Sequence, residues 1–579
     1  MPAEHVKYRP DIDGLRAIAV VAVLGFHAAP AVFPGGFVGV DIFFVISGYL
    51  ITGLIAADLS AGTFTLRRFY GRRIRRIFPA LAVVLVASLL VAWICLLPDE
   101  WRQFGKHLFA GAAFVSNVAL AREGGYFEWS AHFKPLLHLW SLGVEEQFYF
   151  VWPLFLAVLW RAPRSGRVAL LTAAILASFL LNVAAIGRYP AYTFYLPFTR
   201  LWELGLGSWL AVSHRVEGAL RGRRGELAAW TGMALLGTSI AIIRQSERFP
   251  GFWALLPTVG TALLIAAGRG ARINRLVLSN RAVVFVGLIS YPLYLWHWPA
   301  LSFLRIWHGG EIGGVVTLLA LLLSALLAWA TFRWIERPIR SRPFASLPLR
   351  LTCVAMVVLA AVGAGVAAQR IEPRLSTPDV AASMAAANDW TYPFGDNFGR
   401  KQGFVVSTVP GTEPRAILFV GDSHLEQYWP RIQLLTSGRT GPELRFATNG
   451  GCPPLPGLEV DRGEACRNYL SFALQAARDA KVTTVVFAAY WPIYLSGAGD
   501  PQTAASIASF AAEIRTLVRS GKRVFVILAS PASPTFDPRR GIARSDGRLD
   551  LRALPVRELL STAAPKLAAV RQAALAAGA

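Results

Sequence analysis

The strongest constraint in the sequence is a series of apolar segments, each long enough to cross a lipid bilayer. The chain is 54% hydrophobic and only 16% charged, which is too apolar for an ordinary soluble enzyme of 579 residues. About eleven spans are predicted, at residues 14–31, 37–57, 78–97, 141–160, 168–187, 198–213, 228–243, 252–268, 283–304, 313–335 and 350–370. A further apolar stretch, 105–120, is predicted to be re-entrant or interfacial because Arg102, Lys106 and His107 crowd its start.

The cationic residues indicate an orientation for these spans. The net charge is +23, but the lysines and arginines form short clusters between apolar runs, which is typical of membrane topology and not of nucleic-acid binding. If the N-terminus is cytoplasmic, the inside loops hold twenty of these cations and the outside loops hold eight. An odd number of spans then places everything after about residue 370 outside the cytoplasm. The first apolar run has no convincing cleavage site, so it is expected to be a retained span.

A change in composition after the last span indicates a second, soluble part. We expect a membrane domain at 1–345 with about ten spans, one additional transmembrane helix at 346–371, a linker at 372–412 and a soluble domain at 413–579. Short apolar runs at 416–420, 482–488 and 523–528 are typical of buried parallel strands. Helical stretches at about 424–437, 467–480 and 503–520 alternate with them, which predicts a doubly wound, three-layer α/β sandwich.

The first span carries an arginine and a histidine that need an explanation. Arg16 and His27 lie eleven residues apart, so both side chains fall on one helix face, about 16 Å apart along the axis. A buried histidine is common in soluble helices. Inside a bilayer an ionisable side chain is costly unless it faces a cavity or a partner, so this pair is predicted to mark a reaction path across the membrane.

Three other polar groups stand out in the membrane part. Arg72, Arg73, Arg75 and Arg76 form a cluster that suits either lipid headgroups, as a topogenic signal, or a polyphosphate held by guanidinium forks. Polar residues also gather at the start of the fourth span. They are expected either to bind the acceptor or hold a proton, or only to reflect the preference of helix N-termini for negative charge. The residues of that possible site are His138, Ser141, Glu145 and Glu146, with His297 in the ninth span.

The soluble part contains a candidate nucleophile at the end of a predicted strand. Gly421, Asp422, Ser423 and His424 follow the run 416–420, at the sheet edge where catalytic groups collect. Ser423 is a plausible nucleophile, but its sequence neighbour His424 is poorly placed as its base, and none of the nine histidines follows His424. We therefore expect a C-terminally truncated record or a domain that does not hydrolyse esters by itself.

The four cysteines divide into two pairs. Cys452 and Cys466 are close in the sequence and are expected to form a disulfide if the domain is extracytoplasmic, the alternative being two free thiols. Cys95 and Cys353 fall in predicted spans and are expected to be packing residues.

Together these motifs resemble the integral-membrane acyltransferase 3 family, in the subgroup with a C-terminal SGNH-type domain that includes O-antigen acetylases. The resemblance extends from the start of the chain to beyond residue 420. It rests on the ordered blocks Asp11-Ile-Asp-Gly-Leu-Arg-Ala17, Gly36 to Thr52, Phe69 to Pro79, His138 to Tyr149, Tyr291 to Pro299 and Gly421-Asp-Ser-His424.

The resemblance implies an O-acyltransferase, usually an O-acetyltransferase, of the bacterial cytoplasmic membrane. It implies acetyl-CoA or another acyl-CoA as the cytoplasmic donor, with a cell-envelope glycan such as lipopolysaccharide O-antigen, or a lipid-linked saccharide, as acceptor. Arg16 and His27 match the family's essential residues, Arg73 and Arg75 its Arg-x-Arg motif, and Ser423 its SGNH nucleophile. Two departures are the missing Asp-x-x-His and Ala488-Ala-Tyr-Trp491, where an oxyanion asparagine would be typical.

Two other functions fit part of the sequence. A glycan or lipid-linked-sugar transporter with an accessory domain would also have about eleven spans with buried arginine and histidine. A membrane-anchored SGNH serine esterase would use the spans only as an anchor and would need a histidine after His424. The expected partners are membrane lipids, acyl-CoA and a glycan, with no nucleic acid, no metal and no permanently bound cofactor.

Overall fold

The computed structural model divides the chain into two compact units, Met1–Ser376 and Thr377–Ala579. The structure describes residues 8–123, 129–213, 220, 222–244, 248–340, 347–387, 400–401, 404–436, 440–458, 463–496, 500–528, 537–549 and 555–579.

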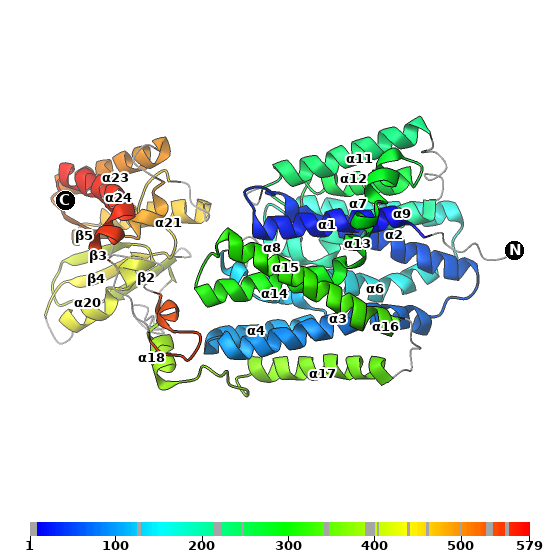
Figure 1. Ribbon diagram of the computed structural model, residues 1–579. Helices are drawn as coiled ribbons and strands as arrows, with labels where there is room; N and C mark the ends of the chain where they lie inside the picture. The colour runs from blue at the N-terminus through cyan, green and yellow to red at the C-terminus, as the bar shows by residue number, and fades with distance from the viewer. Residues whose placement is uncertain are drawn as a thin grey trace. The chain divides into compact units, whose positions relative to one another are not determined.

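The first unit is helical, and its helices lie side by side (Figure 1). Apolar runs flanked by arginine-rich loops produce the long helices, and short proline- or glycine-containing turns separate them. The helices are α1 (Pro10–Ala28), α2 (Gly39–Ser60), α3 (Leu66–Cys95), α4 (Pro98–Ala112), α5 (Ser116–Ala121), α6 (Leu139–Leu159), α7 (Arg164–Ala185), α8 (Pro190–Tyr195), α9 (Pro197–Ser213), α11 (Arg223–Ile242), α12 (Leu255–Ala267), α13 (Arg281–Leu288), α14 (Ser290–His308), α15 (Gly314–Thr331), α16 (Arg337–Arg340) and α17 (Leu347–Ala367).

Every predicted span coincides with helix in the structure. The segment 283–304 is two helices, because α13 ends at Leu288 and α14 begins at Ser290. The stretch 105–120 lies in α4 and α5, and α4 packs against α17. Seven helical segments among the described residues are long and apolar enough to cross a membrane: Gly36–Ser60, Leu66–Cys95, Leu139–Leu159, Arg164–Ala185, Arg223–Ile242, Gly314–Arg340 and Leu347–Ala367. The count of about eleven spans stays a prediction.

Glycines let α2 and α9 approach closely. A Cβ atom at Gly48 would collide with the carbonyl oxygen of Leu204, and one at Gly207 would collide with that of Val45. Small residues at such contacts allow helix backbones to touch inside a membrane, where no hydrophobic effect drives the helices together. The same helix pair is joined by the buried ion pair between Asp41 and Arg200, whose atoms Oδ1 and Nη2 are 3.1 Å apart.

The second unit is an α/β domain around a mixed sheet. The strands are β1 (Arg400–Lys401), β2 (Phe404–Val409), β3 (Ala416–Gly421), β4 (Glu443–Thr448), β5 (Val482–Ala488) and β6 (Arg523–Ile527), in the order β1-β2-β4-β3-β5-β6. β4, β3, β5 and β6 are parallel, whereas β2 is antiparallel to β4 and to β1.

Helices cover both faces of this sheet and make it a three-layer domain (Figure 1). Alternate residues of β3 face opposite sides, so Leu418 and Val420 belong to one apolar core and Phe419 belongs to the other. Leu418 and Val420 share their core with residues of α21 (Gly463–Ala477), α23 (Pro501–Arg519) and α24 (Val556–Ala576). Phe419 packs with residues of α19 (Ser423–Glu426) and α20 (Trp429–Thr436).

The three predicted strands, β3, β5 and β6, are present and parallel, and the sheet also contains β2, which runs antiparallel to β4. Two expectations for this part were wrong. The predicted linker 372–412 contains α18 (Pro378–Ala387) as well as β1 and β2. The predicted helix 424–437 is two short helices, α19 and α20. Truncation of the chain at its C-terminus stays a prediction.

The disulfide expected between Cys452 and Cys466 is present. It closes a loop with a sequence separation of 14, which corresponds to about 3 kcal/mol in the chain-entropy model. We expect the double substitution Cys452→Ser with Cys466→Ser to destabilise the unit 377–579 by about that amount. Urea-dependent proteolysis of the full chain in detergent would measure the loss. The substitution Cys353→Ser is the control because Cys353 is a free thiol on α17, and an equal effect of both changes would contradict the prediction.

Candidate active site

A pocket of about 90 Å³ lies among five helices of the first unit. Its wall combines arginines, hydroxyl groups and one carboxylate with aliphatic and aromatic side chains. The lining residues are Arg16 on α1, Val40, Phe43, Ile46, Ser47, Leu50 and Ile51 on α2, Arg73, Arg76 and Ile77 on α3, Ser141, Leu142, Glu145 and Tyr149 on α6, and Ser290, Tyr291 and Tyr294 on α14. We call this the arginine pocket.

Helical spacing decides which arginines reach the arginine pocket. Arg73 and Arg76 are three residues apart on α3 and therefore share a face, and both line the pocket with Arg16. Arg72 instead pairs with Asp58, with 2.7 Å between Nη2 and Oδ2. Arg75 donates from Nε to the carbonyl oxygen of Gly71 at 3.1 Å. The structure thus places two of the four predicted donor-binding arginines in the pocket and the other two outside it.

The charge of the arginine pocket suits an anionic ligand. Three arginines and one carboxylate line it, and the carboxylate is held by other groups. Glu145 accepts hydrogen bonds from Ser47 Oγ at 3.1 Å and from Tyr149 Oη at 3.0 Å. The Arg73 side chain is buried, and its Nε has no hydrogen-bond partner among the described residues. Because an unpaired buried guanidinium N–H is costly, this donor is suited to a bound anion.

A second polar cluster, the histidine cluster, consists of His27, His138 and His297. His27 Nδ1 and His297 Nε2 are 3.0 Å apart, and the two rings stack with an angle of 14° between their planes. His138 precedes α6, and its ring centroid lies 6.0 Å from that of His297. All three side chains are buried, and neither ring nitrogen of His138 has a hydrogen-bond partner among the described residues. Sequence reasoning predicted these residues separately, and the structure brings them together.

Tyr294 connects the arginine pocket to the histidine cluster. It lines the pocket, and its ring centroid is 5.5 Å from those of both His138 and His297. Its hydroxyl lies 2.8 Å from Ser141 Oγ and donates to the carbonyl oxygen of His138 at 2.8 Å. Arg16 therefore belongs to the pocket and His27 to the cluster, with Ser141 and Tyr294 between them. Sequence reasoning missed Tyr294, although it stands three residues before His297 in the same motif.

Glu146 lies outside the pocket lining. It is adjacent to Glu145, and its Oε1 is buried without a hydrogen-bond partner among the described residues. The possible acceptor or proton site thus divides in the structure: Ser141 and Glu145 face the pocket, and His138 and His297 belong to the histidine cluster.

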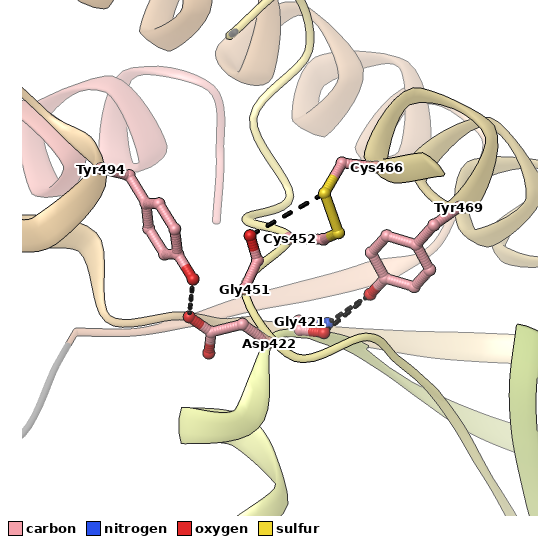
Figure 2. The surroundings of a disulfide bond; sticks show 7 residues. All are labelled: Gly421, Asp422, Gly451, Cys452, Cys466, Tyr469 and Tyr494. Carbon is pink, nitrogen blue, oxygen red and sulfur yellow. Dashed lines mark hydrogen bonds between the residues drawn. A yellow bond between two sulfur atoms is a disulfide. The ribbon is translucent and has the colours of Figure 1, made fainter. Parts of the chain in front are cut away.

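In the second unit, the Gly-Asp-Ser-His block lies at the end of β3, as the apolar run predicts. Gly421 is the last residue of the strand, and Asp422, Ser423 and His424 follow it. Asp422 is fully buried and caps α19 by accepting the N–H of His424 at 2.8 Å. Its other oxygen accepts the N–H of Tyr490 at 3.0 Å. The same oxygen accepts the hydroxyl of Tyr494 at 2.9 Å (Figure 2). Asp422 therefore fixes the turn that presents Ser423 through three accepted hydrogen bonds.

A tyrosine and the disulfide hold the neighbouring loop (Figure 2). Tyr469 on α21 accepts the N–H of Gly421 at 3.1 Å and lies within 2.8 Å of the carbonyl oxygens of Gly421 and Ala447. Burial raises the pKa of Tyr469, so its hydroxyl stays protonated and can donate. Cys466, on the same helix, ties down the loop after β4 through Cys452.

Ser423 has no histidine base among the described residues. It is half-buried, and no hydrogen bond joins it to a histidine in the described part of the chain. The His424 ring stacks on Tyr490, with 4.4 Å between the centroids, and its Nδ1 is buried without a partner there. Asn449 follows β4 at the same edge of the sheet, and its N–H donates to the carbonyl oxygen of Gly421 at 3.1 Å.

Comparisons with known proteins place both units. The family model described as an acyltransferase domain matches residues 9–334, and the model of the SGNH domain fused to such domains matches residues 393–578. O-acetyltransferase OatA of Staphylococcus aureus strain MRSA252 is 31% identical over 377 residues, covering 61% of this chain and 61% of that protein. Peptidoglycan O-acetyltransferase OatA of Listeria monocytogenes is 29% identical over 363 residues, covering 58% and 57%.

The chain thus spans about three fifths of the length of these curated relatives. No solved structure matches. The acyltransferase model, however, covers more than half of the chain and includes both the arginine pocket and the histidine cluster. The chain belongs to the acyltransferase 3 family and carries the SGNH domain that is fused to such domains.

Proposed function

We propose that this protein is a membrane O-acyltransferase, most simply an O-acetyltransferase, that transfers an acyl group from cytoplasmic acyl-CoA to a hydroxyl of a cell-envelope glycan. The observation that carries the proposal is the adjacency of the arginine pocket and the histidine cluster, linked by Tyr294. Family membership and the O-acetyltransferase names of the relatives support the reaction class.

The arginine pocket has the chemistry that an acyl-CoA requires at its phosphate groups. Arg16, Arg73 and Arg76 offer forked N–H donors that match phosphate oxygens. Aliphatic residues of α2 in the same wall suit the apolar parts of a pantetheine arm. We propose that this end of the bundle faces the cytoplasm, where acyl-CoA is found, and the excess of lysine and arginine in the loops expected to be inside supports this orientation.

The histidine cluster supplies the base. In the proposed step, His27 removes the proton of the acceptor hydroxyl as its oxygen forms a bond to the thioester carbon. The carbon–sulfur bond then breaks, and the coenzyme A thiolate leaves. In an alternative order of steps, His27 first takes the acyl group from the thioester as the thiolate leaves, and then passes it to the acceptor hydroxyl. On this view Ser423 passes on the acyl group or helps to position the glycan on the outer side.

The relatives bear on the acceptor. The Listeria relative is named as acting on peptidoglycan, whereas the O-antigen expected from the sequence finds no support among the relatives described above. We therefore propose a glycan of the peptidoglycan type as the first acceptor to test.

The test is mass spectrometry of envelope glycans from cells with and without the gene. We expect alkali-labile acetyl groups on the glycan only when the gene is present. A transporter would instead change the location of the glycan without acetylating it. Unchanged glycan acetylation would contradict the proposal.

A further inference from the structure

The contact between His27 and His297 constrains which nitrogen of each ring carries a proton. His27 lies in the last turn of α1, and His297 lies in the middle of α14. His27 Nδ1 and His297 Nε2 are at a hydrogen-bond distance of 3.0 Å. One proton occupies such a contact, so one of these nitrogens donates and the other accepts.

A backbone carbonyl decides the direction of this hydrogen bond. His297 Nδ1 lies 3.3 Å from the carbonyl oxygen of Leu293, one turn earlier on α14. A carbonyl oxygen can only accept, so Nδ1 of His297 carries the hydrogen. A neutral imidazole has a single N–H, which leaves His297 Nε2 as an acceptor. His27 Nδ1 is then the donor, and the lone pair of His27 is on its Nε2.

The surroundings favour two neutral rings. His27 and His297 are buried, and a charge in such a place is costly. Arg305, the one arginine of α14, already lies close by and donates to the carbonyl oxygen of His27 at 2.8 Å. The other titratable groups that face His27 among the described residues are His132, from the segment Trp129–Phe133, and His138, before α6.

We infer that His297 is a positioning residue that holds His27 in the Nδ1–H tautomer, so that Nε2 of His27 is the basic atom in acyl transfer. The inference rests on the proposed function. After His27 accepts the acceptor's proton on Nε2, its Nδ1–H still donates to His297, and the ring keeps its orientation. A neutral imidazole thus occupies the place that a carboxylate has in a serine hydrolase triad.

Two substitutions of equal polarity separate this role from a structural one. In His297→Gln, the amide oxygen reaches about as far as Nε2 and can still accept the His27 Nδ1–H. In His297→Asn, the side chain reaches only about as far as Nδ1 and cannot. We expect His297→Asn to lower kcat about 100-fold or more with little change in the KM for acetyl-CoA, and His297→Gln to stay within about tenfold of the wild type.

The assay uses the purified full chain in lipid vesicles, with acetyl-CoA and soluble peptidoglycan fragments as probes. In His297→Gln the rate should fall toward acidic pH at the same pH as in the wild type, because His27 Nδ1–H still has a hydrogen-bond acceptor in this variant. In His297→Asn the pH of this fall should change. Equal activities and identical pH profiles of the two variants would overturn the inference.

A second measurement does not depend on activity. ¹⁵N NMR of the chain labelled at histidine distinguishes Nδ1–H from Nε2–H, and the His27→Gln variant identifies the His27 signals. We expect the proton on Nδ1 of His27 in the wild type and in His297→Gln, and a loss of this preference in His297→Asn. A proton on Nε2 in the wild type would overturn the inference. Absence of transfer by the wild type would instead contradict the proposed function, while the NMR result would still decide the tautomer.

Discussion

Substitution of His27 by alanine is expected to abolish acyl transfer while leaving a folded protein in the membrane. A well-placed general base contributes about 10²- to 10⁴-fold to a rate, and His27 is the base in the proposed step. His27 is buried beside His297 and Trp298, 4.4 Å from the indole centroid of Trp298, so its ring is held in one place. Transfer of labelled acetyl groups from acetyl-CoA to peptidoglycan fragments measures the loss.

The control for this prediction is His308→Ala. His308 is also a histidine in the last turn of a membrane helix, α14, but it is exposed and lies outside the histidine cluster. It should retain full activity. Size-exclusion profiles in detergent should be the same for both variants and the wild type. Full activity of a folded His27→Ala protein would remove His27 from the mechanism.

Substitution of Arg73 or Arg76 by glutamine is expected to raise the KM for acetyl-CoA by about 10- to 100-fold. A hydrogen bond to a charged group contributes about 1.5–3 kcal/mol, and 1.4 kcal/mol corresponds to a factor of ten. Both side chains line the arginine pocket, and the buried Arg73 has an N–H without a partner among the described residues. The effect should fall on KM more than on kcat, because the proposed role of these groups is to bind phosphates away from the reacting carbon.

Arg75→Gln is the matched control, since it removes the same charge from the same helix. Arg75 bonds to the carbonyl oxygen of Gly71 and is absent from the pocket lining. Its KM should rise much less than that of Arg76→Gln. The motif assigns Arg73 and Arg75 to the donor, whereas the geometry favours Arg73 and Arg76, so a larger effect at Arg75 would support the motif against the geometry.

The helices were predictable because their signal is local. Each predicted span coincides with helix, since an apolar run in a bilayer must satisfy its backbone hydrogen bonds within itself. The strands β3, β5 and β6 were predictable as continuous apolar runs for a similar reason. The turn at Asp422 followed from its place at the end of β3.

The strand β4 was missed because its signal depends on neighbours distant in the sequence. Its residues alternate, with Glu443 and Arg445 among apolar ones, and these two pair with each other at 2.9 Å. Arg445 also pairs with Asp479, near the start of β5, at 2.6 Å. Charged residues that form ion pairs in this way can occupy one strand of a sheet whose other parallel strands are continuous apolar runs.

The candidate site was only partly predictable for the same reason. Its residues could be chosen one by one, because ionisable groups are costly in a membrane span. Their grouping could not, since the contact of His27 with His297 joins residues 270 apart in sequence. Likewise, the division of the four arginines between the pocket and Asp58 or Gly71 depends on how α3 is rotated against its neighbours.

The most direct test of the account is the sidedness of the reaction. The full chain would be reconstituted in sealed vesicles sorted so that the unit 377–579 is accessible to protease outside. With labelled acetyl-CoA enclosed and peptidoglycan fragments added outside, we predict that acetyl groups appear on the outer glycan, and that His27→Ala vesicles remain inactive. Transfer that occurs only when donor and glycan share one side, or no use of acetyl-CoA at all, would contradict the account.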